Sequence, residues 1–254
     1  MMDKVIEVTR MAGEVVRDGF GKNFSIDFKS NETDLVTEID KKSEKVILDY
    51  IKKEFPAHSI LAEESGRFDS DSEYRWVIDP IDGTVNFAHG LPMFAVSVAL
   101  QKNKQTIAGA VYDVMNDRMF TAEKGGGAFC NSEKLAVRDN DNLKKSLLVT
   151  GFPYELIDKI PVLMEKYSYF LANSRSLRRL GSAALDLCYV ASGVFDGFWE
   201  MRLHLWDVAA GNLIVEEAGG KVTDYSNNPI IDDCKEILAT NGKVHDHMLK
   251  VLGE

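Results

Sequence analysis

Two apolar runs in the middle of the chain constrain its fold most. Residues 94–100 (F-A-V-S-V-A-L) and 107–114 (I-A-G-A-V-Y-D-V) are apolar almost throughout, without the polar alternation of a half-exposed strand. Strands of this kind are buried on both faces, so other elements must cover their sheet from both sides. Shorter strands at 119–122 and 128–130 follow on either side of Gly125–Gly127, and these short connections predict an antiparallel meander.

Amphipathic helices are expected to supply part of that cover. Apolar residues recur at three- and four-residue spacing over 3–20, and again from Thr37 to about Phe55, where Pro56 ends the second helix. The segment between these helices has no periodicity and many turn formers, so we expect a loop or a loose hairpin that carries Lys29.

The second half of the chain alternates between short strands and helices. The polar stretch Arg138–Asn142 is the expected boundary between an N-terminal half, 1–140, and a C-terminal half, 141–254, which together form one compact unit. Strands are expected at 146–150, 177–180 and 194–201, and helices over 155–171, after Ser182, and from Asp207 to Gly219; a strand, a turn, a strand and a helix follow.

Composition excludes several classes of protein. With 254 residues the chain can bury a large core, and its net charge of -10 argues against binding nucleic acid through bulk charge. The three cysteines, Cys130, Cys188 and Cys234, are far apart and support neither a disulfide framework nor a CxxC metal site. No stretch approaches the roughly 20 apolar residues of a membrane span, so we expect a soluble, cytoplasmic protein with no membrane partner.

An acidic turn lies within the stretch 76–87, W-V-I-D-P-I-D-G-T-V-N-F. A predicted strand from Tyr74 to Ile78 delivers Asp79 and Asp82 to a point where proline and glycine turn the chain. Two aspartates followed by glycine and a hydroxyl residue fit a hard-metal site beside exposed amides, which together would bind phosphate. The alternative is an ordinary turn in which the aspartates accept local amide hydrogen bonds.

Two more carboxylates could join this turn. Glu63 follows a predicted strand at 59–62, and Asp207 stands at a predicted helix start. Four neighbouring carboxylates would repel one another unless cations neutralised them, and magnesium prefers oxygen-only ligands. Asp207 also has a local explanation, because an aspartate N-cap stabilises a helix by about 1 kcal/mol without any other function.

Thr84 and Asp40 form a candidate pair for activating water. The Thr84 hydroxyl follows the acidic turn directly and could orient a metal-bound water. Asp40 has an equally good local explanation, since Thr37–Asp40 fits a capping box that opens a helix. Residues 83–86 could form a short helix whose free N–H groups bind phosphate, or an ordinary glycine turn. Small residues after Ser182 leave room for a ligand, but they also fit close packing.

Six segments together resemble the inositol monophosphatase family. They are A-E-E-S at 62–65, D-P-I-D-G-T-V-N-F at 79–87, W-D-V-A-A-G at 206–211, D-L-V-T-E-I-D at 34–40, G-S-A-A at 181–184 and E-A-G-G at 217–220. The resemblance spans nearly the whole chain. It implies an α+β fold built as a layered α-β-α-β-α sandwich, a homodimer, and inhibition by lithium.

The resemblance also implies a role for each site residue. Two or three Mg²⁺ ions would be held by Glu63, Asp79, the carbonyl of Ile81, Asp82 and Asp207. Thr84 and Asp40 would activate the attacking water. Substrate contacts would come from the amides of Gly83 and Thr84, from Asp82, from Ser182 and Ala183, and from Glu200, which falls where relatives bind substrate hydroxyls.

The implied reaction is magnesium-dependent hydrolysis of a small phosphate monoester. Inositol monophosphate is the first expectation for the substrate, and fructose bisphosphate is the second. The positions around the substrate, including Arg178, Arg179 and Arg202, are those at which family members diverge. The alternative from another class is a metal-binding scaffold or regulatory protein, although such a protein would not need Thr84 and Asp40.

Overall fold

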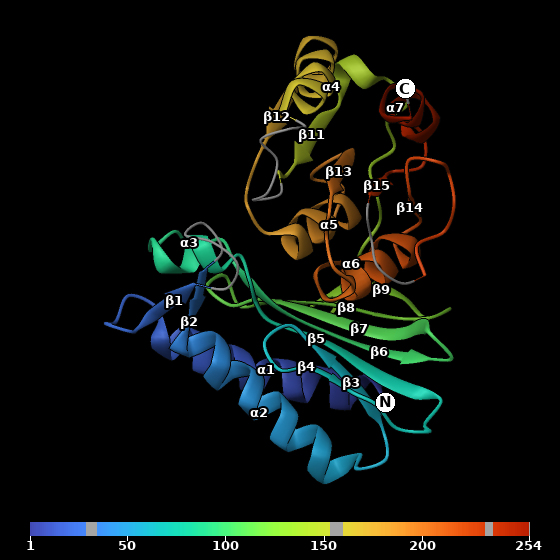
Figure 1. Cartoon of the computed structure of the whole chain (residues 1–254). Helices are drawn as coiled ribbons and strands as arrows, with labels where there is room; N and C mark the ends of the chain where they lie inside the picture. The colour runs from blue at the N-terminus through green and yellow to red at the C-terminus, as the bar shows by residue number, and fades with distance from the viewer. Residues whose placement is uncertain (29–34, 153–159, 232–235, 254) are drawn as a thin grey trace.

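Two β-sheets and three helical layers alternate through the molecule (Figure 1). The computed structural model describes residues 1–28, 35–152, 160–231 and 236–253. Lys29, Asp34, Cys234 and the first residues of the helix predicted over 155–171 lie outside this described part. The order of the layers is helix, sheet, helix, sheet, helix, so the expected α+β layered sandwich is confirmed.

The first helical layer and the larger sheet come from the N-terminal part of the chain. The layer consists of α1 (Met2–Gly19) and α2 (Glu38–Glu54), as the apolar periodicity predicts. The sheet has eight strands in the order β10-β9-β8-β7-β6-β5-β3-β4. Its strands are β3 (Ser59–Ala62), β4 (Gly66–Phe68), β5 (Tyr74–Asp82), β6 (Ala95–Lys102), β7 (Gln105–Asp113), β8 (Arg118–Glu123), β9 (Gly127–Cys130) and β10 (Glu133–Lys134).

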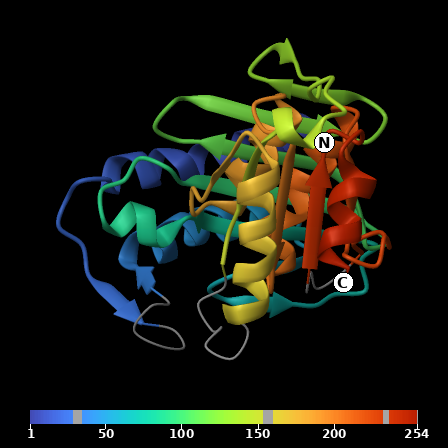
Figure 2. The ribbon, with the colours of Figure 1, turned by 90° about the horizontal axis from the view of Figure 1, so that it is seen from above.

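The remaining layers come from the C-terminal part. The smaller sheet has five strands in the order β12-β11-β13-β15-β14. Its strands are β11 (Leu147–Thr150), β12 (Ser176–Arg178), β13 (Gly197–Met201), β14 (Lys221–Thr223) and β15 (Glu236–Thr240). Helices α5 (Ala183–Ala191) and α6 (Leu205–Glu217) lie between the sheets, and α4 (Ile160–Asn173) and α7 (His245–Leu252) cover the outer face of the smaller sheet (Figure 2).

Four short elements complete the described part of the chain. Strands β1 (Ile26–Phe28) and β2 (Leu35–Thr37) pair antiparallel, which favours the hairpin over the loop as the expected alternatives. A single helical turn, α3 (Thr84–Ala88), follows the acidic turn, and a 3₁₀ turn, η1 (Leu143–Lys145), precedes β11.

The apolar run at 94–100 divides its side chains between two cores. Val96, Val98 and Leu100 pack in the core beneath α1 and α2, whereas Ala95 and Ala99 face the core around α5 and α6. Both cores are fully buried, which explains why this strand lacks polar alternation. The predicted antiparallel meander is confirmed by the ladders that join β5 through β9.

Close packing holds α6 against the larger sheet. A side-chain carbon placed on Gly109 of β7 would lie 2.9 Å from the Cα atom of Ala210, which is too close for two carbon atoms. On the other side of the helix, Gly211 packs in the same way against Leu187 of α5. The small residues of the W-D-V-A-A-G segment therefore allow α6 to pack closely between β7 and α5.

Two predicted boundaries are wrong near the site. Strand β5 does not end at Ile78 but continues through Pro80 to Asp82, with an irregularity in its pairing to β6 between Asp79 and Asp82. Proline is tolerated there because a bulge interrupts the hydrogen-bond ladder. Helix α6 begins at Leu205 and not at Asp207, so Asp207 is the third residue of the helix and not its N-cap.

Two further expectations are that the cysteines form no disulfide framework and that the chain divides into two halves at the polar stretch 138–142. Cys130 and Cys188 are free thiols, and burial raises the pKa of both. The core around α5 and α6 combines residues such as Phe120 and Ile214 from both sides of the polar stretch 138–142. The boundary between two halves at that stretch stays a prediction. Within the described residues, no helix is both long and apolar enough to cross a membrane.

Candidate active site

The parallel pairing of β3 and β5 brings two acidic segments together. Ala62 lies opposite Ile78 in this ladder, and the backbone N–H of Glu63 donates to the carbonyl of Ile78 over 3.2 Å. Because parallel strands end at the same edge of a sheet, Glu63 arrives beside Asp79. Local sequence patterns do not predict this pairing, because β3 and β5 are not consecutive strands.

The irregular end of β5 buries its two aspartates. Asp79 is 2% exposed and Asp82 is 8% exposed. One carboxylate oxygen of Asp79 accepts from the amide of Ile81 over 3.0 Å, which is the local turn bond that the simpler interpretation expects. The bond uses only Oδ1, so the second oxygen of Asp79 can still take another partner.

Helix α5 holds the carboxylate of Asp82 at its N-terminus. The Ser182 hydroxyl donates to Oδ2 of Asp82, and the amides of Ala184 and Ala183 donate to its two oxygens over 2.8 and 3.3 Å. Ser182 and Ala183 were expected to contact substrate. In this structure they bind Asp82, so the direct substrate contact stays a prediction.

Asp207 combines a helix-capping role with a position beside the other carboxylates. Its Oδ2 accepts from the backbone N–H of His204 over 2.6 Å, which forms a capping box for α6. Burial and then the negative charges of Glu63 and Asp82 raise the pKa of Asp207, so its carboxylate is within electrostatic reach of theirs. Asp207 therefore caps α6 from the third position of the helix, and not as its N-cap, while its carboxylate lies near the cluster.

The pKa values of these carboxylates show that they form one electrostatic unit. Burial and then the charges of Glu63, Asp82 and Asp207 raise the pKa of Asp79 well above its usual range. Burial and then Glu63 and Asp82 do the same for Asp207. Burial also raises the pKa of Asp82 to about 6, although the hydrogen bonds from Ser182 and Ala184 oppose this shift. A cation among these groups would relieve the repulsion.

The donor chemistry of the cluster suits a hard divalent cation. Every one of these side chains offers carboxylate oxygens, which are the ligands that Mg²⁺ prefers. Within the described ranges, however, no three histidine, cysteine, aspartate or glutamate side chains are arranged so that they could hold one ion between them. The carboxylates are thus close enough to repel one another without forming a closed ion cage. The assignment of individual metal ligands stays a prediction.

Thr84 and Asp40 are brought together from two distant elements. The Thr84 hydroxyl lies 2.9 Å from Oδ1 of Asp40 and 2.9 Å from the carbonyl of Ile81. The other oxygen of Asp40 accepts from the backbone N–H of Thr37 over 2.9 Å, so the predicted capping box is also present. Burial raises the pKa of Asp40 to about 6. One carboxylate therefore caps α2 and contacts Thr84.

Gly83 lies between the end of β5 and the start of α3. Its φ of 96° places it in the left-handed region that glycine adopts without strain, and α3 follows directly from Thr84. The predicted short helix is thus confirmed, whereas phosphate binding by its first amides stays a prediction.

Glu200 lies on the side of the site formed by the smaller sheet. A side-chain carbon on Gly151 would come within 2.1 Å of the Glu200 carboxylate, so the glycine leaves the space that Glu200 occupies. Burial and then Asp82 raise the pKa of Glu200 to about 8, and Arg179 opposes this shift. These interactions place Glu200 near Asp82, and its contact with substrate hydroxyls stays a prediction.

Sequence reasoning missed two buried polar residues around the site, Asn86 and Asp186. Asn86 donates through its side-chain amide to the carbonyls of Met93 and Leu180 over 2.7 and 2.9 Å, which joins the segment after the acidic turn to the chain before α5. Asp186 of α5 is fully buried, and neither of its oxygens has a hydrogen-bond partner. Asn86 stands inside the 79–87 segment and could have been selected there, but no local pattern distinguishes Asp186.

Comparison with known proteins identifies the family. The model of the inositol monophosphatase family matches residues 1–254. The chain belongs to the inositol monophosphatase family.

Individual members of the family match this chain over almost its whole length. The chain is 44% identical to the chloroplastic phosphatase IMPL1 of Arabidopsis thaliana, over 97% of this chain and 68% of that protein. It is 41% identical to a fructose-1,6-bisphosphatase/inositol-1-monophosphatase of Aquifex aeolicus, over 98% and 96%. The crystal structure of the extragenic suppressor protein suhB from Bartonella henselae superposes with a TM-score of 0.95 at 38% identity, covering 100% and 98% of the two chains.

Proposed function

We propose that this inositol monophosphatase family member is a magnesium-dependent phosphoric monoester hydrolase whose substrate is inositol-1-phosphate. The observation that supports this most is the 2.9 Å contact between the Thr84 hydroxyl and Asp40, beside a buried group of carboxylates at one sheet edge. A protein that only binds metal would have no use for a hydroxyl group polarised in this way.

The carboxylates and the carbonyl of Ile81 define where cations would bind. Glu63, Asp79, Asp82, Asp207 and that carbonyl would hold two or three Mg²⁺ ions. When bound, the ions would lower the pKa of a water molecule and neutralise charge on the leaving oxygen. Asp82 is already held through Oδ2 by Ser182 and Ala184, and its Oδ1 keeps a second lone pair with which to coordinate a cation.

Thr84 and Asp40 would orient the attacking water. Asp40 accepts the proton of the Thr84 hydroxyl, which leaves the lone pairs of Thr84 Oγ1 free to accept from water. The oriented water attacks phosphorus directly, the P–O bond to the alcohol breaks, and the alcohol oxygen takes up a proton that the water has lost, so no covalent phosphoenzyme forms. The amides of Gly83 and Thr84, at the start of α3, bind the phosphate oxygens.

Glu200 would select the substrate by binding its hydroxyl groups. Its carboxylate is partly buried near Asp82, where it can hydrogen-bond to a polyol that carries the phosphate. A related protein from Aquifex aeolicus is named both a fructose-1,6-bisphosphatase and an inositol-1-monophosphatase. We therefore keep fructose bisphosphate as the second candidate substrate.

A panel of phosphate esters tests this proposal. Phosphate release should be measured from inositol, sugar and nucleotide phosphates, with and without Mg²⁺ and Li⁺. We expect release from inositol-1-phosphate that requires Mg²⁺ and falls with Li⁺. Faster release from fructose bisphosphate would favour the second substrate, and no release from any ester would favour a metal-binding scaffold or regulatory protein.

A further inference from the structure

Helix α2 carries three buried polar residues on the face that points to the active site. Asp40, Ser43 and Glu44 are each at most 1% exposed, and their spacing of three and four residues puts them on one side of the helix. Each contacts a different segment of the site. Asp40 contacts Thr84, and the Ser43 hydroxyl donates to the carbonyl of Pro80 over 3.1 Å in the irregular end of β5.

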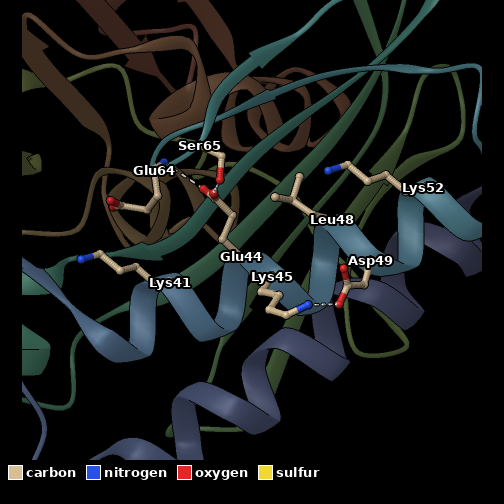
Figure 3. Close-up of a pocket in the computed structure, with 8 residues that line it drawn as sticks. All are labelled: Lys41, Glu44, Lys45, Leu48, Asp49, Lys52, Glu64 and Ser65. Atoms are coloured by element: carbon tan, nitrogen blue, oxygen red, sulfur yellow. Dashed lines mark hydrogen bonds and ion pairs between the residues drawn. The ribbon is translucent and has the colours of Figure 1, made fainter.

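Glu44 contacts the turn that presents Glu63. Its Oε2 accepts from the backbone N–H of Glu64 over 2.8 Å, and its Oε1 accepts from the Ser65 hydroxyl (Figure 3). The turn is short, because Ala62 of β3 and Gly66 of β4 already pair across it. Both oxygens of a fully buried carboxylate are thus used on two consecutive residues of a three-residue turn.

The outer side of this turn faces a cavity. The cavity has a volume of about 410 Å³ and is lined by Glu44, Leu48, Glu64, Ser65 and by charged residues of α2. Figure 3 shows Glu44 reaching from α2 to the turn, with Lys41 and Lys45 on either side of it. On the side of this cavity, the two hydrogen bonds that Glu44 accepts from the turn help to fix its position.

On the inner side, the turn is held by the larger sheet. The amide of Glu63 pairs with the carbonyl of Ile78 in β5. The Glu63 side chain thus starts from a backbone that is fixed by β5 on one side and by Glu44 on the other. A displacement of the turn would move the Glu63 carboxylate relative to Asp79. The two groups interact, since the charge of Glu63 contributes to the raised pKa of Asp79.

We propose that Glu44 is a positioning residue that holds the 63–65 turn through Glu64 and Ser65, and thereby sets the affinity of the active site for its divalent cation. The proposal rests on the proposed function, in which Glu63 is a cation ligand. Residues that orient metal ligands without touching the metal typically change metal affinity or activity by about 10- to 100-fold when they are replaced.

Two substitutions of Glu44 separate hydrogen bonding from charge. Glu44→Met keeps the length of the side chain but removes both acceptors. Glu44→Gln keeps both bonds without the charge, because its carbonyl oxygen can accept from Glu64 while its amide donates to the Ser65 hydroxyl. Leu48→Ala is the matched control, since Leu48 lies one turn further along α2, lines the same cavity and is buried. The Leu48→Ala substitution should lower stability but leave the hydrogen bonds between Glu44 and the turn in place.

The experiment measures Mg²⁺ binding by calorimetry, the Mg²⁺ dependence of phosphate release, and hydrogen exchange of the 62–66 peptide. For Glu44→Met we expect Mg²⁺ affinity to fall at least roughly tenfold, with faster exchange in that peptide and a partial recovery of turnover at high Mg²⁺. Glu44→Gln should stay within about threefold of wild type, and Leu48→Ala should keep the wild-type Mg²⁺ affinity at whatever thermal stability it retains.

Several outcomes would overturn the proposal. Wild-type Mg²⁺ affinity in a folded Glu44→Met protein would do so, and so would an equal loss of affinity in Leu48→Ala. If Glu44→Met does not fold, Ser65→Ala removes one of the two bonds at an exposed residue and should weaken Mg²⁺ binding in the same direction. A wild-type protein that neither binds Mg²⁺ nor releases phosphate would refute the proposed function itself, and the role of Glu44 with it.

Discussion

Asp40 shows that a local explanation for a residue does not exclude a functional one. One of its oxygens accepts from the amide of Thr37 at the start of α2, and the other accepts from the Thr84 hydroxyl. The capping bond also fixes the carboxylate, so the same contact that stabilises the helix orients the group that meets Thr84. Asp207 combines a capping bond to His204 with a place among the site carboxylates in the same way.

Removal of the Thr84 hydroxyl should reduce turnover strongly. Thr84→Ala leaves Asp40 and its capping bonds in place but removes the group that would orient the water, so kcat should fall by about 10²- to 10⁴-fold. Thr84→Ser keeps the hydroxyl and is the matched control. Steady-state phosphate release checks this prediction, and a Thr84→Ala enzyme with at least a tenth of the wild-type kcat would contradict it.

Replacement of Asp82 should abolish turnover while the fold remains. Asp82→Asn keeps the shape of a side chain held by Ser182 and Ala184 but removes the charge, so activity should fall by about 10²- to 10³-fold or more. Circular dichroism should match wild type. Asp49→Asn, at an exposed carboxylate of α2 that pairs with Lys45, should leave activity unchanged. Near-wild-type phosphate release from Asp82→Asn at saturating Mg²⁺ would disprove the assignment.

At the level of elements, the position of α6 depends on a missing side chain in β7. Gly109→Ala would force a methyl group to within 2.9 Å of the Cα atom of Ala210, and such overpacking costs about 1 to 3 kcal/mol. Because α6 carries Asp207, activity should fall as well. Chemical denaturation and phosphate release measure the two effects. Ala210→Gly in the same protein should recover part of the loss, and fully additive effects would show that the two positions do not interact.

Helix α7 and the last strands should give the fold a pH dependence. The His245 ring is fully buried between the hydroxyls of Thr223 and Thr240, each at 3.0 Å, and burial lowers the pKa of His245 to about 4. In the unfolded chain His245 therefore takes up a proton near pH 6.5, whereas in the folded protein it does so only near pH 4. This contribution to stability is present above pH 6.5 and is lost as the pH falls toward 4.

Between pH 7 and pH 5, the loss should amount to about 2 kcal/mol of unfolding free energy from His245. Urea denaturation at the two pH values measures it. His245→Gln can still bond to one of the threonines but cannot take up a proton, so the change from pH 7 to pH 5 should be about 2 kcal/mol less destabilising in this variant than in wild type. An unchanged difference would assign the pH dependence to other groups.

For the whole molecule, the buried carboxylates should make stability depend on divalent cations. Mg²⁺ at about 100 times its dissociation constant would stabilise the folded state by about 2.7 kcal/mol, which for a chain of this size corresponds to a rise of roughly 5 to 10 °C in Tm. Differential scanning fluorimetry with Mg²⁺ and with a chelator checks this. NaCl at equal ionic strength is the control, and an equal rise in an Asp79→Asn variant would contradict a cation bound at the cluster.

We also propose that the molecule is a homodimer, as the family resemblance implies. The chain has a mass of 28.4 kDa, so light scattering after size-exclusion chromatography should give about twice this value. A mass of one chain across the accessible concentration range would contradict the proposal.

Local patterns in the sequence determined most of the elements. Apolar periodicity gave α1 and α2, and the unbroken apolar runs required a sheet covered on both faces. The motifs at 62–65, 79–87 and 206–211 were sufficient for the resemblance to the family. These signals are short-range, because each depends on residues that are neighbours along one helix, strand or turn.

Only the tertiary structure decided which of these residues meet. The parallel pairing of β3 with β5 places Glu63 beside Asp79, and α2 brings Asp40 to Thr84 across 44 positions of sequence. The bulge that extends β5 to Asp82 and the contact of Glu44 with the 63–65 turn had no local signature either. Such contacts depend on how elements pack in three dimensions, which local propensity does not encode, and they are the contacts that assemble the candidate active site.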